Sequence, residues 1–214
     1  MANLLRLILI AVVTSSTLAA CSFLSGNNLS SPNKSLENTP LPSVANIDPK
    51  TFEPERIPDA PYLQTPQEVV IEMLKMAKVS QADLVYDLGS GDGRIVITAA
   101  QRFGAKAIGI EIDPELIRES EREMKLAIAQ APQIRDQIKF IKQDLFKTDL
   151  RNATVITLYL LPQANLRVRS EILPKLKSGT RIVSYEYDLG DLPPNQVKKV
   201  KVGDREHTIY LWIL

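Results

Sequence analysis

The chain has 214 residues, 44% of them hydrophobic, which suffices for one sizeable folded domain and leaves no room for two full ones. Its 26 lysines and arginines nearly balance its 25 aspartates and glutamates, so no overall positive field attracts nucleic acid, and we expect no nucleic-acid partner. A single cysteine and a single histidine exclude an intramolecular disulfide and zinc-type ligand spacing.

Residues 1–21 have the pattern of a targeting segment. Arg6 is their only charge, an apolar run follows over residues 7–13, and the segment ends in Leu18-Ala19-Ala20-Cys21. This pattern resembles a bacterial lipoprotein signal, which implies that Cys21 is the lipidated N-terminus of the mature protein. The alternative is a short transmembrane anchor or an uncleaved signal that holds the chain at the cytoplasmic face. Either way, we expect anchoring to a membrane through the N-terminus.

Residues 22–60 read as a tether. They are rich in serine, asparagine and proline, and more than half of the 14 prolines lie between Pro32 and Pro66. Such a composition cannot bury enough apolar surface to offset the entropy of ordering, so we expect disorder here. The regular pattern of one folded domain then occupies residues 61–214.

The domain opens with an amphipathic helix. Thr65-Pro66-Gln67-Glu68 is a capping box with proline in the first turn, and an apolar face follows at helical spacing over residues 69–77. A short apolar segment over residues 84–89 then predicts a buried strand.

A glycine-rich turn follows this strand and opens the next helix, expected over residues 92–103. Gly89, Gly91 and Gly93 let a ligand approach the backbone closely. The bare amides of the turn and the positive end of the helix favour a carboxylate or phosphate. The alternative is a tight strand-to-helix turn that binds nothing.

The spacing of the glycines favours one class of nucleotide. A dinucleotide fingerprint needs its third glycine at position 94, where this chain has Arg94. The G-x-G-x-G order, with Asp87 two residues before it, resembles motif I of class I S-adenosylmethionine-dependent methyltransferases. The resemblance implies S-adenosylmethionine as cofactor, held by Gly89, Gly91 and Gly93, with Asp87 suited to its ammonium group.

A second acidic residue supports a nucleotide site. Glu111 ends the next predicted strand, over residues 105–112, and lies eighteen residues beyond Gly93. A carboxylate at this place suits the hydroxyl groups of a ribose.

The remaining pattern alternates between strands and helices. Strands are expected at 138–143, 155–161 and 180–187, and helices at 114–130 and 163–176. Residues 197–202 and 208–214, joined by a turn over 203–206, read as an antiparallel hairpin. Together these elements predict an α/β fold: a doubly wound, seven-stranded, Rossmann-like methyltransferase sheet with an antiparallel C-terminal hairpin.

Several segments resemble a more specific group. The Pro61-Tyr62-x-x-Thr65-Pro66 entry, the D-L-G-S-G-D-G-R-I-V block, residues 142–150 and the L-Y-L-L-P-x-x-N-L-R run resemble a bacterial branch related to the ATP synthase c-subunit lysine methyltransferase family. The resemblance covers roughly residues 60–190, and Gln64 departs from the proline of many relatives. It implies that Tyr62 contacts the cofactor, that Asp144 binds the adenine amino group and that Leu145 contacts the ring. In isolation, Asp144 is equally consistent with an ordinary turn residue.

The end of the fourth strand is where such enzymes place the methyl acceptor. Its sequence, Thr157-Leu158-Tyr159-Leu160-Leu161-Pro162, is not the Asn-Pro-Pro-Tyr type of motif found in amino-group methylating DNA enzymes, which argues against a nucleobase acceptor. Tyr159 is a weak candidate for bordering the acceptor, and the alternative is a packing aromatic.

Five other polar residues have weaker signals. His207 is expected at the surface beside the hairpin turn. Glu186 and Asp188 end the fifth strand, where they could bind a cationic acceptor or be solvated acids of the loop. Arg167 and Arg169 fit a solvated helix face better than a binding role.

The resemblance therefore implies a methyltransferase that acts on a protein amino group, a lysine, and the N-terminal segment would hold it near a membrane, with an integral membrane protein among the candidate acceptors. The alternative is a membrane-tethered nucleotide-binding protein of the same fold without catalysis, because exported proteins have no obvious S-adenosylmethionine supply. Nicotinamide-dependent oxidoreduction is disfavoured by Arg94 and by the terminal hairpin.

Overall fold

A computed structural model of the protein describes residues 62–214. The targeting segment with Cys21 and the tether over residues 22–60 lie outside the described residues, so both stay predictions. No helix between residues 62 and 214 is both long enough and apolar enough to cross a membrane.

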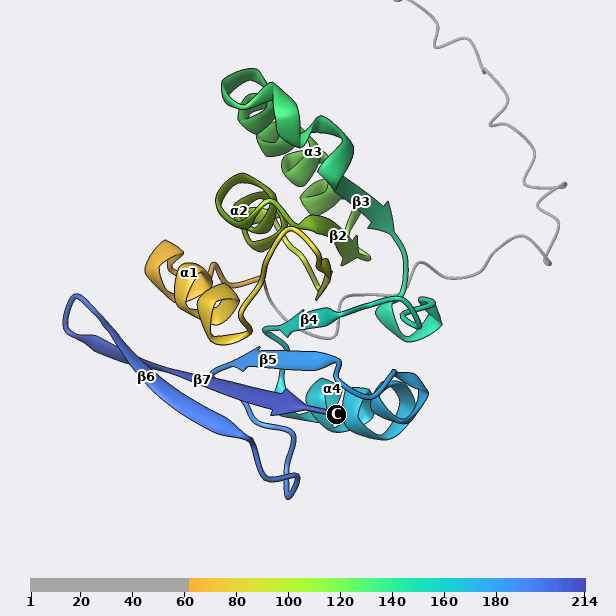
Figure 1. Cartoon of the computed structure of the whole chain (residues 1–214), viewed down its shortest axis with the longest axis vertical. Helices are drawn as coiled ribbons and strands as arrows, with labels where there is room; N and C mark the ends of the chain where they lie inside the picture. The colour runs from red at the N-terminus through yellow and green to blue at the C-terminus, as the bar shows by residue number, and fades with distance from the viewer. Residues whose placement is uncertain (1–61) are drawn as a thin grey trace, which may run out of the picture. The chain divides into compact units, whose positions relative to one another are not determined.

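Seven strands of the described region form one sheet in the order β3-β2-β1-β4-β5-β7-β6 (Figure 1). Their bounds are β1 Leu84–Leu88, β2 Lys106–Glu111, β3 Ile138–Lys142, β4 Val155–Leu158, β5 Arg181–Tyr185, β6 Gln196–Val202 and β7 Arg205–Ile213. The first five strands are mutually parallel, and β7 runs antiparallel to both β5 and β6. The predicted doubly wound sheet with its antiparallel C-terminal hairpin is confirmed.

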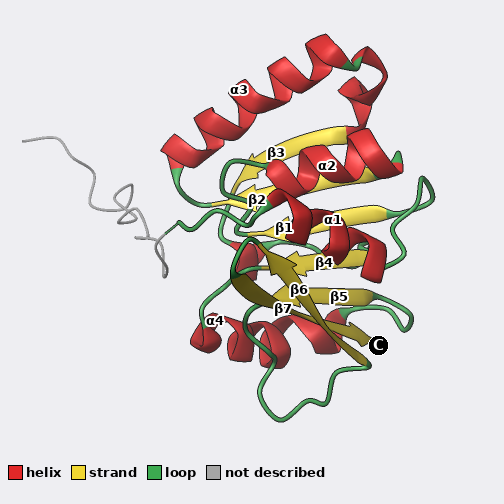
Figure 2. Ribbon diagram, turned by 90° about the vertical axis from the view of Figure 1, so that its left-hand side faces the viewer, coloured by secondary structure: helices red, strands yellow, loops and turns green. Residues whose placement is uncertain are grey.

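Helices cover both faces of this sheet (Figure 2). One face carries α1 Gln67–Met76, α2 Arg94–Phe103 and α3 Pro114–Gln130, whose apolar sides pack with the sheet into one buried cluster. The other face carries α4 Pro162–Arg167 and the turns after it, which form a second cluster around Trp212. Because the central strands are buried on both faces, they read in the sequence as continuous apolar segments.

The start of α1 differs from the expected capping box. The helix begins at Gln67, after Pro66, and no side chain caps its first turn. The carbonyl of Thr65 instead accepts a hydrogen bond of 2.8 Å from Nη1 of Arg94. The segment before α1 is therefore tied to the glycine turn.

The helix expected over residues 163–176 is interrupted. After α4 the chain forms a wide π turn over Val168–Ile172 and then a 3₁₀ turn over Leu173–Lys175. Pro174 explains the change, because its ring nitrogen cannot donate to the carbonyl one turn earlier and its ring disfavours a regular helix. The hairpin turn is also tighter than expected: only Gly203 and Asp204 separate β6 from β7.

Candidate active site

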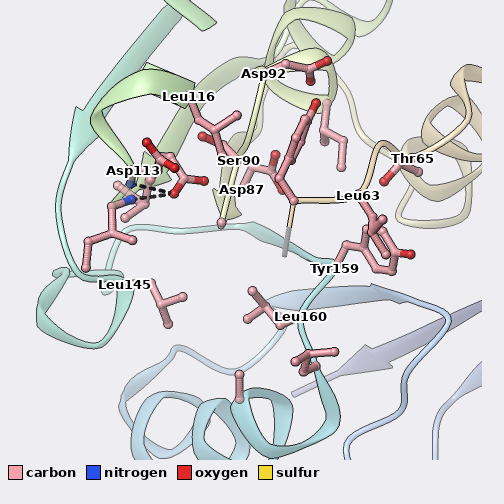
Figure 3. Close-up of a pocket in the computed structure, with 18 of the residues that line it drawn as sticks. Leu63, Thr65, Asp87, Ser90, Asp92, Asp113, Leu116, Leu145, Tyr159 and Leu160 are labelled. Atoms are coloured by element: carbon pink, nitrogen blue, oxygen red, sulfur yellow. Dashed lines mark hydrogen bonds between the residues drawn. The ribbon is translucent and has the colours of Figure 1, made fainter. Parts of the chain in front are cut away.

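A pocket lies at the carboxyl ends of β1, β2 and β4, where the chain order of the sheet reverses direction (Figure 3). After β1 the chain adds β2 and β3 on one side, and then crosses to β4 and β5 on the other. Open α/β sheets bind ligands at this kind of switch point, because the two diverging connections leave a crevice there.

The floor of the pocket is the glycine turn, which the backbone of β2 holds in place. The amides of Gly89 and Ser90 both donate to the carbonyl of Ile110, at 2.8 and 3.0 Å. The amide of Gly91 donates to Oε2 of Glu111 at 2.9 Å. The turn is thus fixed before any ligand arrives.

Two glycines of this turn are required by close packing. Gly91 has a φ of 54°, and a Cβ there would lie 2.4 Å from the ring of Tyr62. Gly93 has a φ of 80°, and its Cβ would lie 2.3 Å from the ring of Phe140. Either substitution would force backbone strain and a steric clash together.

Asp87 supplies a buried negative charge at the end of β1. Its side chain lines the pocket, the residue is 2% exposed, and Oγ1 of Thr157 donates to its Oδ1 at 2.6 Å. Burial, with smaller contributions from Glu111 and Asp92, raises the pKa of Asp87 to about 7. Among the described residues no cation pairs with it, so a cationic ligand group would stabilise its ionised form.

Glu111 lines the same pocket from the end of β2. Its Oε1 accepts hydrogen bonds from the amides of Ile112 and Asp113, at 2.7 and 3.0 Å, while Oε2 holds Gly91. A carboxylate fixed in this way has lone pairs left for hydroxyl groups of a ligand. The same bonds mean that Glu111 also shapes the glycine turn.

Tyr62 covers the glycine turn from the segment before α1. Burial and a hydrogen bond with Asp92 raise the pKa of Tyr62 to about 12. Asp92 in turn accepts from Nε of Arg94 at 2.9 Å, and Arg94 also binds the carbonyl of Thr65. Tyr62, Asp92, Arg94 and Thr65 thus form a connected latch over one side of the pocket. The sequence did not lead us to predict this latch, although the Asp-Gly-Arg spacing within the glycine turn was a signal for an internal ion pair.

Asp144 and Leu145 lie in the pocket wall after β3, as expected. The Oδ1 atom of Asp144 accepts from the amide of Phe146 at 3.0 Å and so begins the short 3₁₀ turn Leu145–Lys147. Asp144 is thus a turn residue that also lines the pocket, and its binding of an adenine amino group stays a prediction.

The opposite wall, after β4, is aromatic and aliphatic. Tyr159, Leu160 and Leu161 line it, together with Tyr187 from the segment after β5. Tyr159 also packs on Tyr185, with their ring centroids 4.4 Å apart, so it borders the pocket and contributes to the packing behind it.

His207 is not at the surface, and that expectation was wrong. It is 5% exposed, and its Nδ1 lies 2.7 Å from the hydroxyl of Tyr185 and 3.1 Å from Oε1 of Glu186. The reason is the alternation along β7, which turns His207 to the same face as the buried residues Ile209 and Leu211. Hairpin spacing alone could not show which face of the strand is buried.

The other polar candidates have structural partners. Asp188 accepts from the amide of Gly190 at 3.0 Å in an exposed loop. Arg167 pairs with Glu171 at 2.9 Å, and its guanidinium lies 3.7 Å from the ring centroid of Phe146. Arg169 pairs with Asp191.

This pocket fits S-adenosylmethionine in its chemistry. Buried Asp87 suits an ammonium group, Glu111 suits a ribose, and the apolar wall around Leu145 suits a purine ring. Because its glycines have no side chains, the turn lets a ligand contact the backbone directly.

Comparisons with known proteins agree with this fit. Residues 87–196 match the ANTKMT methyltransferase domain. A protein-lysine N-methyltransferase of Saccharolobus islandicus is 43% identical over 159 residues, which cover 74% of this chain and 96% of that protein. The ATP synthase c-subunit lysine N-methyltransferase of Xenopus laevis is 27% identical over 72% of this chain, and the matched part is 63% of that protein.

One solved structure extends the agreement to the fold and cofactor. It is described as an RNA methyltransferase from Salinibacter ruber in complex with S-adenosyl-L-homocysteine, and it superposes with a TM-score of 0.63 at 42% identity. The alignment covers 71% of this chain and 93% of that one.

Proposed function

Because the chain belongs to the ANTKMT methyltransferase domain family and is an S-adenosylmethionine-dependent methyltransferase, we propose that it methylates lysine side chains of proteins. The observation that carries this proposal is the 43% identity to a protein-lysine N-methyltransferase over nearly the whole of that relative.

We assign the pocket residues as follows. Asp87 binds the ammonium group of the cofactor, Glu111 its ribose hydroxyls, and Asp144 with Leu145 its adenine. The turn of Gly89, Gly91 and Gly93 approaches its methionine portion, and Tyr62 closes over that turn. The pocket geometry supports these roles, because all of these residues except Gly91 and Gly93 line it and those two glycines form the turn beneath it.

The reaction asks little of the protein beyond alignment. The cofactor supplies an activated methyl group, and the acceptor nitrogen must present an unprotonated lone pair to it. The wall of Tyr159, Leu160, Leu161 and Tyr187 can exclude water from an alkyl-ammonium chain and orient it toward the cofactor pocket. Such a wall favours the neutral amine, because desolvation disfavours the charged form.

The Salinibacter structure makes RNA the second candidate acceptor. The near balance of charge, 26 basic against 25 acidic residues, and the Tyr-Leu-Leu-Pro end of β4 favour protein over nucleic acid.

The test offers the full-length chain three acceptors with radiolabelled S-adenosylmethionine: detergent-solubilised membrane proteins, soluble proteins, and total RNA. We expect label in protein, recovered as methyl-lysine after hydrolysis. Asp87→Asn serves as the inactive control, and Asp188→Asn, which alters an exposed acid outside the pocket, as the active one. Label confined to RNA would overturn the proposal, and cofactor binding without transfer to any fraction would favour the non-catalytic alternative.

We further propose that the protein works at a membrane, with an integral membrane protein as a candidate acceptor. The Leu-Ala-Ala-Cys21 sequence and the Xenopus relative, which is named for the c-subunit of ATP synthase, support this. Tyr62 both follows the tether and lines the pocket, so an anchored tether would join the domain beside its active site. Protease treatment of spheroplasts, with mass spectrometry of the N-terminus, tests it: a lipidated Cys21 indicates an exported lipoprotein, an unprocessed and protected chain a cytoplasmic-face anchor, and release into the soluble fraction would contradict both.

A further inference from the structure

Exposed apolar side chains gather at the opening of the pocket. Seven large hydrophobic side chains of the described region are exposed, and three of them, Tyr62, Leu63 and Tyr187, line this one pocket. We call these three residues the pocket rim. Leu63 is the most exposed of the seven, at 60%. Folding gains little from apolar side chains that stay in water, so three of them at one opening indicate an interaction surface.

The latch holds Leu63 at the opening. Leu63 lies between Tyr62, which forms a hydrogen bond with Asp92, and Thr65, whose carbonyl accepts from Arg94 at 2.8 Å. Figure 3 shows Leu63 on the segment that leads into α1, among the residues that line the pocket. Its side chain therefore contributes apolar surface to the opening and not to the hydrophobic core.

A buried amide holds the Tyr187 side of the pocket rim. Asn165 is fully buried on α4, three residues after Pro162, and its Nδ2 donates to the carbonyls of Tyr187 and Asp188 at 3.1 and 3.0 Å. Oγ of Ser184 also donates to the carbonyl of Tyr187. These bonds fix the backbone that carries the Tyr187 ring. Both sides of the pocket rim are thus held in place before a substrate arrives, which lowers the entropy cost of binding one.

Charges around the pocket favour a cationic ligand over an anionic surface. Among the described residues that line the pocket, Arg94 is the only basic one, and it pairs with Asp92. The acidic residues that line it are Asp87, Asp92, Glu111, Asp113 and Asp144. Anionic lipid headgroups and nucleic-acid phosphates bind where basic residues are in excess. The pocket rim therefore suits a protein segment that presents a lysine together with apolar neighbours.

We propose that the pocket rim binds apolar side chains that flank the acceptor lysine in its own chain. This inference rests on the proposed lysine acceptor. A lysine must pass Tyr62, Leu63 and Tyr187 to reach the cofactor, so the residues beside it meet these three side chains. The chain before residue 62 joins the domain at the same place, so an N-terminal anchor would hold the pocket rim near the apolar segments of membrane proteins.

Two synthetic peptides test the proposal with the full-length chain. Each has a single lysine and the same terminal arginines for solubility, and the lysine is flanked by leucines in one peptide and by serines in the other. We expect kcat/KM of the unaltered protein to be about tenfold higher for the leucine peptide. The difference should lie mainly in KM, because the flanking residues are buried equally in the bound substrate and in the transition state.

Leu63→Ser should reduce this preference to about twofold, through a higher KM for the leucine peptide. Tyr187→Ser should reduce it as well, which tests the other side of the pocket rim. Leu126→Ser is the matched control, because Leu126 is an exposed leucine of α3 that does not line the pocket, and it should keep the full preference. Calorimetry should find the S-adenosylmethionine affinity of Leu63→Ser within about twofold of that of the unaltered protein.

Three results would overturn the proposal. The first is an unchanged preference in Leu63→Ser together with weaker cofactor binding, which would assign Leu63 to the cofactor site. The second is weaker binding of Leu63→Ser to phosphatidylcholine–phosphatidylglycerol vesicles with an unchanged preference, which would show that the pocket rim faces lipid. The third is a faster reaction of Leu63→Ser with the leucine peptide, which would show that another segment of the chain covers the pocket rim.

The same peptides separate this inference from the proposed function. Methylation of neither peptide would count against the lysine acceptor itself. Equal kcat/KM for the two peptides would confirm lysine methylation and refute only the role of the pocket rim.

Discussion

Asp87 shows how a single buried carboxylate weakens the fold that carries it. Its carboxylate is buried beside two other acids, Glu111 and Asp92, and burial is the main reason for its raised pKa. The unfolded chain would ionise this group at its ordinary lower pKa. The native state therefore holds a proton that the unfolded state has lost, and the cost of folding grows as the pH rises toward 7.

Asp87→Asn should accordingly stabilise the ligand-free protein. Asparagine can still accept the hydrogen bond from Thr157, and it removes the buried charge. We expect Tm to rise by about 3 to 6 °C at pH 8 and by less at pH 5, where the native Asp87 is already protonated. Scanning calorimetry at the two pH values measures this, and a Tm that falls at pH 8 would contradict it. The same variant should lose S-adenosylmethionine binding.

The cofactor affinity should depend on pH for the same reason. In the proposed binding mode the cofactor's ammonium group favours ionised Asp87, whose pKa is raised by burial to about 7. Between pH 7.5 and pH 6 we expect the Kd for S-adenosylmethionine to rise roughly fivefold to tenfold, because binding at the lower pH must first release a proton. Titration calorimetry in two buffers of different ionisation enthalpy would detect that proton. An unchanged Kd and no proton release would disprove the assignment of Asp87.

At the residue scale, the sequence predicted which acids line the pocket better than it predicted the contacts of His207 and Glu186. Asp87, Glu111 and Asp144 were predictable because each follows a strand of a recognisable alternating unit, at the sheet edge where ligands bind. His207 and Glu186 were not, because their meeting depends on the insertion of β7 beside β5 and on one left-handed residue. Neither feature has a local sequence signal.

At the scale of elements, the latch joins three segments that are separate in the chain. Arg94 begins α2, Asp92 belongs to the glycine turn, and Thr65 precedes α1. Arg94, which stands where a dinucleotide fingerprint needs glycine, thus has a structural role of its own. Arginine there holds the covering segment against the pocket.

Arg94→Ala should therefore loosen the cover without unfolding the domain. We expect cofactor dissociation to accelerate by about fivefold to tenfold, with cleavage by protease within residues 62–66 becoming faster. Stopped-flow displacement of the bound cofactor measures the first effect. Arg102→Ala, an exposed arginine at the other end of the same helix, is the matched control and should change neither rate. Equal dissociation rates in both variants would show that the latch does not retain the cofactor.

The sequence predicted which segments form helices and strands better than it predicted where these helices and strands begin and end. The strands follow the predicted ones within a few residues because their apolar character comes from burial on both faces of the sheet. The irregular turns after α4 were not predicted, because Ile172 and Leu173 kept the helical spacing while Pro174 prevented a regular helix.

At the scale of the whole molecule, residues 62–214 include a seven-stranded sheet with a hydrophobic cluster on each of its faces. A fragment covering residues 61–214 should therefore fold and bind S-adenosylmethionine with an affinity within about twofold of that of the full-length chain. Parallel calorimetry of the two proteins tests this boundary. A fragment that is unfolded, or that binds tenfold more weakly, would assign a structural role to the preceding residues.

The insertion of β7 has a consequence for synthesis on the ribosome. Residues 209–213 pair with β5 and residues 205–211 pair with β6, so β6 has no partner, and β5 has only β4, until this segment has left the exit tunnel. Until then the nascent chain presents β5 as an open edge, and Tyr185 lacks His207. A ribosome stalled before residue 205 would therefore hold a chain whose cofactor-side elements are complete and whose acceptor-side elements are not.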